Sequence, residues 1–173
     1  MIEHLKTLSE IRITMVCMGN ICRSPMAAAV LSNRTTQWSS PKIIVDSSGT
    51  SAWHIGQGAH PTSQKTWEKA GYKYSHSARQ FKSSDFFESD LILVMDSNNY
   101  KKVIELAPDN DSRSKVFYLR CFDPALSAID PASEQFNKLE VPDPYDQSSE
   151  VYEETLVMIE RAVDGLLQEL SHQ

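Results

Sequence analysis

A cysteine and an arginine separated by five residues are the first candidates for chemistry in this chain. Cys17 opens the loop of residues 17–24, Cys-Met-Gly-Asn-Ile-Cys-Arg-Ser, and Arg23 is its seventh residue. A cysteine thiolate is a strong nucleophile, and an arginine guanidinium can hold two oxygens of one phosphate group. With three cysteines in the chain, such a pair arises by chance in about one sequence in ten, so the surrounding sequence must decide.

The sequence around this loop is suited to binding an anion. Residues 11–16 predict a strand before the loop, and residues 24–31 predict a helix after it, with Ser24 as N-cap and Pro25 at the first helical position. Backbone N–H groups and the helix N-terminus would then favour an anion at one point. Gly19 and Asn20 tolerate left-handed backbone. The same positive field would stabilise the thiolate form of Cys17. We therefore prefer a reactive cysteine to the alternative, a small buried apolar residue at the end of a strand.

An acid for the leaving group is expected from a second motif, Val-Pro-Asp-Pro-Tyr-Asp at residues 141–146. An aryl phosphate that is attacked by a thiolate needs a proton on its departing oxygen. Asp143 lies between two prolines, which stiffen the backbone and help to aim one carboxylate. The alternative for this motif by itself is a proline-rich turn closed by an aspartate side chain.

The elements that must position these residues alternate between strands and helices. Strands are predicted at residues 11–16, 43–45, 91–95 and 115–119. Helices are predicted at residues 24–31 and 62–70, from a Ser97 cap to before Pro108, and at residues 149–170, with a long loop at residues 120–146. This pattern predicts an α/β fold: one three-layer domain with a four-stranded parallel sheet flanked by helices and a phosphate-binding loop between strand 1 and helix 1. The loops after strands 1, 2 and 4 should therefore converge.

Composition limits the class of protein and its partners. The 173 residues, 40% hydrophobic and 23% charged, fit one domain, which we assign to residues 11–173 after an N-terminal extension at residues 1–10. A net charge of -6 argues against nucleic acid or an anionic membrane as the main partner. Residues 1–10 lack the apolar stretch of a secretory signal, and no run approaches the roughly 20 apolar residues of a membrane span. We therefore expect a cytoplasmic protein.

No metal or other cofactor is expected. Cys17 and Cys22 lack the spacing of a structural zinc site, and the histidines show no helical pairing of ligands. The histidines are His4, His54, His60, His76 and His172.

Taken together, the motifs resemble one family, the low-molecular-weight protein tyrosine phosphatases. The matching segments are VCMGNICRSPMAAAV (16–30), DSSGTSAWHIG (46–56), SHSARQ (75–80), LVMDSNN (93–99) and DPYD (143–146). They occur in the family's order and extend over nearly the whole chain, from about residue 11 to 170. The resemblance implies a protein tyrosine phosphatase that acts through a phosphocysteine intermediate.

The resemblance also implies roles for individual residues. Cys17 would be the nucleophile, Arg23 would bind the phosphate, and Asp143 would be the general acid and then the base that activates water. The phosphate-binding residues would be Met18, Gly19, Asn20, Ile21, Cys22, Arg23 and Ser24.

Supporting residues follow from the same resemblance. Ser24 would donate a hydrogen bond to the Cys17 sulfur. Asn20 would hold the unusual backbone of the loop, supported by Ser47 and His76.

A substrate slot is implied as well. Trp53 and Tyr145 would form its walls around a flat aromatic ring, which suits phosphotyrosine better than the shorter phosphoserine. The expected partners are phosphotyrosine-containing proteins or peptides and small aryl phosphates. We expect a monomer, with a weak dimer left open.

Four departures from the family pattern stand out. Ala28 replaces a usual glutamate, and Asp146 stands where many eukaryotic relatives have a second aromatic residue. Residues 123–140 form a longer stretch than is typical, and residues 1–10 extend the usual start.

Three rival functions remain for comparison. Arsenate reductases resemble this loop but relay a disulfide through further downstream cysteines, of which only Cys121 is present. Arginine-phosphate-specific relatives carry threonine where Ile21 stands, so Ile21 with Trp53 favours an aromatic ester. A non-catalytic phosphate-binding module would be expected to lose the nucleophile or the acid, and both Cys17 and Asp143 are present.

Cys22 suggests redox regulation. Cys17 and Cys22 lie in one short loop, so their sulfurs could come within disulfide reach after modest backbone movement. Peroxide would convert the Cys17 thiolate to a sulfenic acid, which could then condense with Cys22. The alternative is that Cys22 is a small buried residue that packs under the helix.

Overall fold

The computed structural model describes residues 1–171, so the predicted domain end and His172 lie outside the described residues. Four strands form one sheet in the order β2-β1-β3-β4, and every neighbouring pair is parallel. This confirms the predicted four-stranded parallel sheet. The strands are β1 (Glu10–Cys17), β2 (Lys42–Gly49), β3 (Leu91–Val94) and β4 (Val116–Tyr118).

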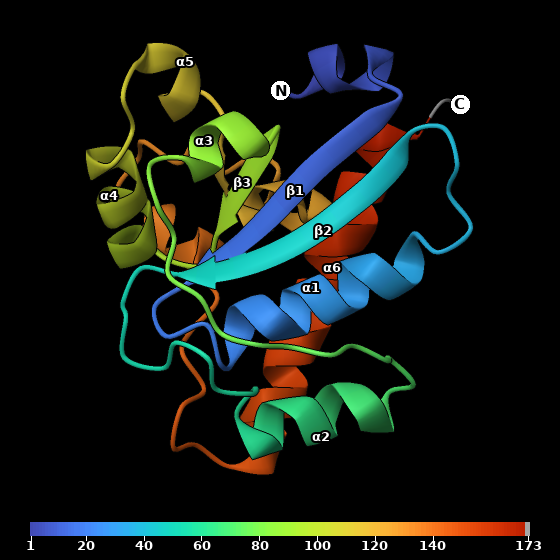
Figure 1. Cartoon of the computed structure of the whole chain (residues 1–173), viewed down its shortest axis with the longest axis vertical. Coiled ribbons are helices and arrows are strands. Elements are labelled where there is room, and N and C mark those ends of the chain that lie inside the picture. The colour runs from blue at the N-terminus through green and yellow to red at the C-terminus, as the bar shows by residue number, and fades with distance from the viewer. Residues whose placement is uncertain (172–173) are drawn as a thin grey trace.

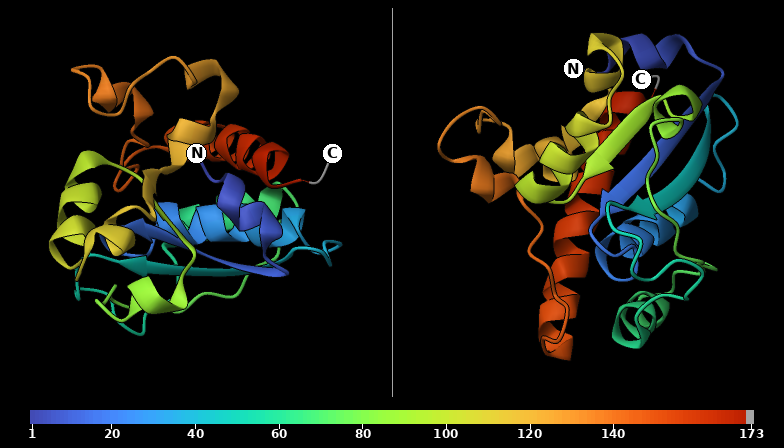
Figure 2. Two further views of the ribbon diagram at one scale, coloured as in Figure 1. Left: turned by 90° about the horizontal axis from the view of Figure 1, so that it is seen from above. Right: turned by 60° about the vertical axis from the view of Figure 1, so that its left-hand side comes forward.

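Helices cover both faces of the sheet (Figure 1). Viewed from above, α1 and α6 lie on one side of the strands and α3 lies on the other (Figure 2). The described residues thus form the predicted three layers. The α-helices are α1 (Arg23–Arg34), α2 (Pro61–Lys69), α3 (Asp85–Glu88), α4 (Ser97–Glu105), α5 (Asn110–Arg113) and α6 (Ser149–Leu170).

The two central strands are buried on both faces because their side chains alternate between two apolar clusters. Met15 and Leu93 belong to the cluster with α1 and α6, whereas Val16, Ile92 and Val94 belong to the cluster with α3 and α4. Strands buried in this way read as continuous apolar runs, which is why the sequence of β3 was easy to recognise.

The structure corrects two predicted helix starts. Cys22 is the N-cap of α1, so the prediction of Ser24 as N-cap is wrong. The Ser24 hydroxyl instead contacts the Cys17 sulfur and the Asn20 amide, and it is not available to cap the helix. For α4 the N-cap is Asp96, whose carboxylate accepts from Asn99 N at 2.8 Å, and not Ser97.

Strand β2 is longer than the three residues predicted for it. It continues through Asp46 and Ser48 to Gly49 because its backbone pairs with β1 along all eight residues, whatever the polarity of the side chains. The predicted long loop after β4 holds three short 3-10 helices, and residues 123–140 project away from the sheet (Figure 2). They are η2 (Leu119–Phe122), η3 (Pro124–Leu126) and η4 (Phe136–Leu139).

The N-terminal residues pack against the rest of the fold. They form a 3-10 helix, η1 (Glu3–Thr7), that contacts α6. Ile2 and Leu5 are buried in the cluster that also contains α1 and α6. Within residues 1–171, no helix combines the length and apolar character needed to cross a membrane.

A close approach between α6 and η2 generates a prediction about stability. A Cβ atom at Gly165 would lie 1.8 Å from the carbonyl oxygen of Phe122. Alanine in a helix is normally about 1 kcal/mol more favourable than glycine, but this overlap reverses the sign. We expect Gly165→Ala to lower the free energy of unfolding by about 1–3 kcal/mol, measured as a lower urea midpoint. Gly58→Ala is the control, because its Cβ would meet no atom within 4 Å; equal midpoints for the two variants would contradict the prediction.

Candidate active site

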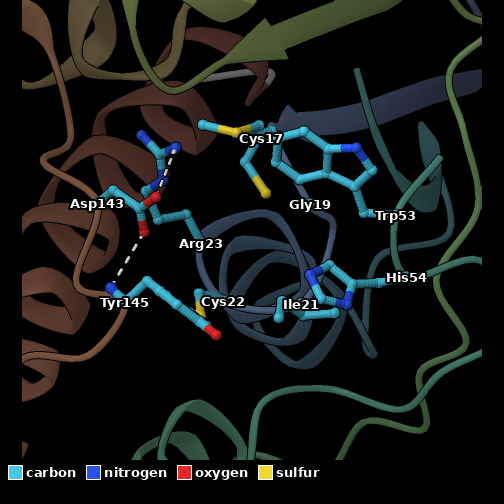
Figure 3. Close-up of a pocket in the computed structure, with 10 residues that line it drawn as sticks. Cys17, Gly19, Ile21, Cys22, Arg23, Trp53, His54, Asp143 and Tyr145 are labelled. Carbon is cyan, nitrogen blue, oxygen red and sulfur yellow. Dashed lines mark hydrogen bonds and ion pairs between the residues drawn. The ribbon is translucent and has the colours of Figure 1, made fainter. Parts of the chain in front are cut away.

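Three loops meet beyond the carboxyl ends of the strands and enclose a cavity of about 360 Å³. The loops that follow β1, β2 and β4 contribute to it, as the parallel topology leads one to expect (Figure 3). Side chains distant in sequence are thereby brought together. The lining residues are Cys17, Met18, Gly19, Ile21, Cys22, Arg23, Trp53, His54, Asp143 and Tyr145.

Asn20 holds the conformation of the loop of residues 17–24, the phosphate loop. Its φ of 57° is in the left-handed region, which asparagine tolerates better than most residues. Its amide nitrogen donates to Ser24 Oγ at 2.8 Å and Ser47 Oγ at 3.0 Å, and its amide oxygen accepts from Arg79 N at 3.0 Å. His76 Nε2 lies 2.6 Å from the Asn20 carbonyl oxygen, and burial lowers the pKa of His76, so a neutral ring donates there.

Carbonyl oxygens of the phosphate loop are hydrogen-bonded to the surrounding segments. Thr50 N donates to Cys17 O at 2.9 Å, and Ser51 N donates to Met18 O at 3.0 Å. The carbonyls of Asn20, Ile21 and Cys22 likewise accept from other segments. Because the C=O and N–H of a trans peptide point in opposite directions, the N–H groups face the inside of the loop. The inside is therefore a site for an anion.

Arg23 is buried and held in a fixed orientation. Its Nη1 donates to Asp96 Oδ2 at 2.7 Å and to Val141 O at 2.9 Å, and its side chain is 2% exposed. Burial alone would lower the pKa of Arg23, but the nearby Cys17 and Asp96 charges outweigh it and the pKa is raised. The guanidinium thus keeps its charge beside the cavity. Asp96 binds Nη1, which leaves Nη2 free of Asp96 and able to bind a ligand.

The cysteines of the phosphate loop have different surroundings. Cys17 Sγ lies 3.0 Å from Ser24 Oγ. Cys22 Sγ lies 3.6 Å from the Tyr152 hydroxyl, and burial raises the pKa of Cys22 to about 12. Burial also raises the pKa of Cys121 to about 11, and Cys121 lines a different cavity. Cys22 and Cys121 are therefore thiols at neutral pH.

Asp143 enters the cavity from the loop after β4. Its Oδ1 accepts from Tyr145 N at 3.1 Å, and its Oδ2 lies 3.8 Å from Arg23 Nη2 (Figure 3). The motif therefore forms the turn closed by the aspartate side chain, which was the alternative interpretation, and the same aspartate also lines the cavity. The side chain is 41% exposed, so it can exchange protons with solvent.

Aromatic rings flank the opening of the cavity. Trp53 and Tyr145 come from different loops and lie on opposite sides of it (Figure 3). They are 74% and 48% exposed, which leaves ring surface free for a ligand.

Two residues near the cavity were not assigned from the sequence. His54 lines the cavity beside Trp53, and Asp96 pairs with Arg23. Asp96 follows closely after the buried strand β3, at the sheet edge where ligands bind, which predicts a place near the site but not its pairing with Arg23. His54 carries no comparable signal in the sequence. Asn20, Ser24, Ser47 and His76 are placed behind the cavity wall and do not line it.

Comparison with known proteins now identifies the family. A sequence model described as low molecular weight phosphotyrosine protein phosphatase matches residues 12–173. The chain belongs to this family. A low molecular weight protein-tyrosine-phosphatase of Streptomyces coelicolor is 39% identical over 163 residues, which are 94% of each chain.

Solved structures agree with this assignment. The crystal structure of a protein tyrosine phosphatase from Entamoeba histolytica, with Hepes in its active site, aligns with a TM-score of 0.80 at 32% identity and covers 92% of this chain and 96% of that one. An arginine phosphatase from Geobacillus stearothermophilus aligns with a TM-score of 0.77 at 29% identity and covers 92% of each chain. The fold by itself therefore does not separate these two substrates.

The environments of the three thiols generate a labelling prediction. We expect iodoacetamide at pH 8 to modify Cys17 in the folded protein, because Cys22 and Cys121 remain protonated there. Inorganic phosphate should slow the modification by occupying the loop. Peptide mass spectrometry is the measurement, and guanidinium should expose all three thiols. Labelling of folded Cys17→Ser as fast as wild type would contradict the prediction.

Proposed function

We propose that this member of the family is a cysteine-dependent phosphatase that hydrolyses phosphotyrosine in proteins or peptides, and small aryl phosphates, through a phosphocysteine intermediate. The observation that carries the proposal is that Cys17, Arg23 and Asp143 line one cavity, whose floor is the anion-binding phosphate loop. A nucleophile, a fixed cation and an exchangeable acid are what transfer of a phosphoryl group to sulfur requires.

In the first step, the N–H groups of residues 18–24 and the Arg23 guanidinium bind the phosphate oxygens. The Cys17 thiolate attacks phosphorus and forms the S–P bond. The bond from phosphorus to the aryl oxygen breaks, and Asp143 donates its proton to that oxygen. When Cys17 is a thiolate, the Ser24 hydroxyl at 3.0 Å donates to its sulfur, which favours the anion both as nucleophile and as leaving group.

In the second step, the Asp143 carboxylate accepts a proton from water while that water attacks the phosphocysteine. The S–P bond breaks, the Cys17 thiolate is regenerated, and inorganic phosphate is released. Asp143 is thereby protonated again, as the next cycle requires. Arg23 keeps its geometry through both steps because Asp96 and the Val141 carbonyl hold one side of its guanidinium.

The remaining site residues act through these groups in the proposal. Asn20 maintains the loop, with support from Ser47 and His76. Trp53 and Tyr145 flank the substrate ring, which favours phosphotyrosine over phosphoserine because the shorter ester would leave the ring surfaces unfilled.

The three rival functions are less well supported. Ile21 supplies an apolar surface in the cavity, whereas arginine-phosphate-specific relatives carry threonine at this position. Cys121 lines a different cavity from Cys17, which argues against a disulfide relay of the kind that arsenate reductases use. Both the nucleophile and the acid are present, which argues against a module that only binds phosphate.

The proposal also covers the limits of the domain, the cellular compartment and the independence of the reaction from metal ions. Residues 11–173 would form the phosphatase domain, with residues 1–10 as an extension. All three cysteines are free, and the cytoplasm, where thiols stay reduced, would be the compartment. Among residues 1–171, no group of three or more histidine, cysteine or acidic side chains is placed to hold a metal ion. Hydrolysis of p-nitrophenyl phosphate and a phosphotyrosine peptide in EDTA tests the proposal, and no activity on either would refute it.

Removing the nucleophile should abolish turnover while phosphate binding persists. Cys17→Ser leaves a hydroxyl that stays protonated near neutral pH, but the N–H groups and Arg23 remain. Arg23→Lys should lower kcat by about 10²–10³-fold, because a point charge cannot replace a two-pronged contact. Steady-state kinetics and vanadate binding are the measurements. Substantial turnover by Cys17→Ser would exclude Cys17 as the nucleophile.

The acid should matter most for poor leaving groups. Asp143→Asn should slow phosphotyrosine hydrolysis by about 10²–10⁴-fold, and p-nitrophenyl phosphate less, because nitrophenolate leaves without a proton. The alkaline limb of the kcat profile should flatten. Asp46, Asp96 and Asp146, changed in the same way, are the matched comparisons. Equal losses on both substrates would remove Asp143 from this role.

Cys22 is proposed to protect the active site from oxidation. Hydrogen peroxide oxidises the Cys17 thiolate, with uptake of one proton, to a sulfenic acid and water; the sulfenic acid condenses with the Cys22 thiol to a disulfide and a second water. Wild type inactivated with peroxide should regain most activity in dithiothreitol, and Cys22→Ser should regain much less. Equal recovery, or no loss of two hydrogens in the intact mass of oxidised wild type, would leave Cys22 with a packing role.

A further inference from the structure

His60 connects α2 to the phosphate loop at a point that the proposed mechanism does not use. Its backbone N donates to the Ile21 carbonyl at 2.8 Å. Its side chain caps α2, with Nδ1 accepting from Thr62 N at 3.1 Å. The position of this residue is therefore fixed from two sides, by the helix it begins and by the loop beside it.

The ring of His60 lies between two tyrosines. It stacks on Tyr152, with centroids 5.6 Å apart and an interplanar angle of 22°. Against Tyr145 it is edge-on, at 5.7 Å and 78°. Tyr152 is fully buried on α6, whereas Tyr145 is half-exposed and lines the cavity. The imidazole thus lies between a buried ring of the core and a half-exposed ring at the opening of the site.

Hydrogen bonds set the orientation of the imidazole. Because Nδ1 accepts from Thr62 N–H, it carries the lone pair, and the ring hydrogen is on Nε2. The Tyr152 hydroxyl lies 3.4 Å from the same Nδ1 and 3.6 Å from Cys22 Sγ. The single lone pair of Nδ1 is used by the shorter contact from Thr62 N, so stacking and the neighbouring Cys22 thiol hold Tyr152 against the imidazole. Ring rotation would break these contacts.

Tyr145 has few other constraints. Its backbone N donates to its own loop, at Asp143 Oδ1, and the next residue, Asp146, has a φ of 58°. Neither the backbone hydrogen bond nor the backbone angle of Asp146 determines where the phenol ring of Tyr145 points. The edge-on contact with His60 does, since aromatic pairs favour this geometry beyond the area that they bury.

We propose that His60 is a positioning residue for the substrate slot: its ring, held by Thr62 and Tyr152, sets the orientation in which Tyr145 flanks the aromatic ring of the substrate. The inference rests on the proposed function, because it requires an aryl phosphate in the cavity. It assigns to His60 a part in selecting aromatic over non-aromatic ligands. A residue that only caps α2 would have no such effect.

Two ligands can be used to distinguish binding in the phosphate loop from binding in the substrate slot. Inorganic phosphate occupies only the loop, whereas phenylphosphonate also places a ring between Trp53 and Tyr145. His60→Asn keeps a capping side chain but removes the ring. We expect its inhibition constant for phenylphosphonate to rise about 2- to 10-fold while that for phosphate stays within about twofold. For a phosphotyrosine peptide, KM should rise and kcat should stay nearly constant.

Matched variants assign the effect to the ring. His60→Phe keeps an aromatic edge and loses the cap, so its ratio of the two inhibition constants should stay within about twofold of wild type. His60→Ser, which also caps, replaces His60→Asn if the latter does not fold. In a Tyr145→Ala background, His60→Asn should change the ratio no further, because the ring it orients is gone. Lys65→Ala, exposed on α2, is the control.

The outcomes are decisive for the inference. An unchanged ratio in the Asn and Ser variants, a loss in His60→Phe as large as theirs, or full additivity with Tyr145→Ala would each overturn it. Wild type that binds neither ligand and hydrolyses no aryl phosphate would instead refute the proposed function. The two failures are therefore distinguishable in one set of measurements.

Discussion

The site depends on the direction of the peptide groups in the phosphate loop. Five of its carbonyls, those of residues 17, 18, 20, 21 and 22, are bonded outward to the segment after β2, to the start of α2 and to His76, so the N–H groups converge inward. Bringing several N–H dipoles together without an anion is unfavourable, and the surrounding fold must maintain this arrangement. The residues that bind these carbonyls form a frame around one short loop; they are Thr50, Ser51, His60, Ser63 and His76.

Arg23 extends the same constraint to the other side of the site. It is the first residue of α1 and is buried, yet its guanidinium reaches Asp96 after β3 and the Val141 carbonyl after β4. A buried cation is tolerated only when its hydrogen bonds are satisfied, and these two partners satisfy one side of it. The arginine thus joins three loops and leaves its remaining donors toward the cavity.

Much of this could be predicted from the sequence because its signals are local. The apolar run of β3, the periodicity of α6 and the strand–loop–helix context of Cys17 depend on neighbours in the chain. The sequence-based predictions were wrong where contacts of the folded chain overrode a local signal. Ser24 resembles an N-cap, but its hydroxyl is directed to Cys17 and Asn20, and β2 continues through polar residues because β1 pairs with it.

The sequence by itself determined the nucleophile, arginine and acid candidates, the family and the parallel sheet, since residue types and spacing carry that information. Only the tertiary structure decided which side chains hold them. Asp96 beside Arg23 is separated from it by 73 residues, and Tyr152 beside Cys22 by 130. Such pairings depend on how helices dock on the sheet, and no local pattern encodes that distance. The His60 ring between Tyr145 and Tyr152 is likewise a product of packing.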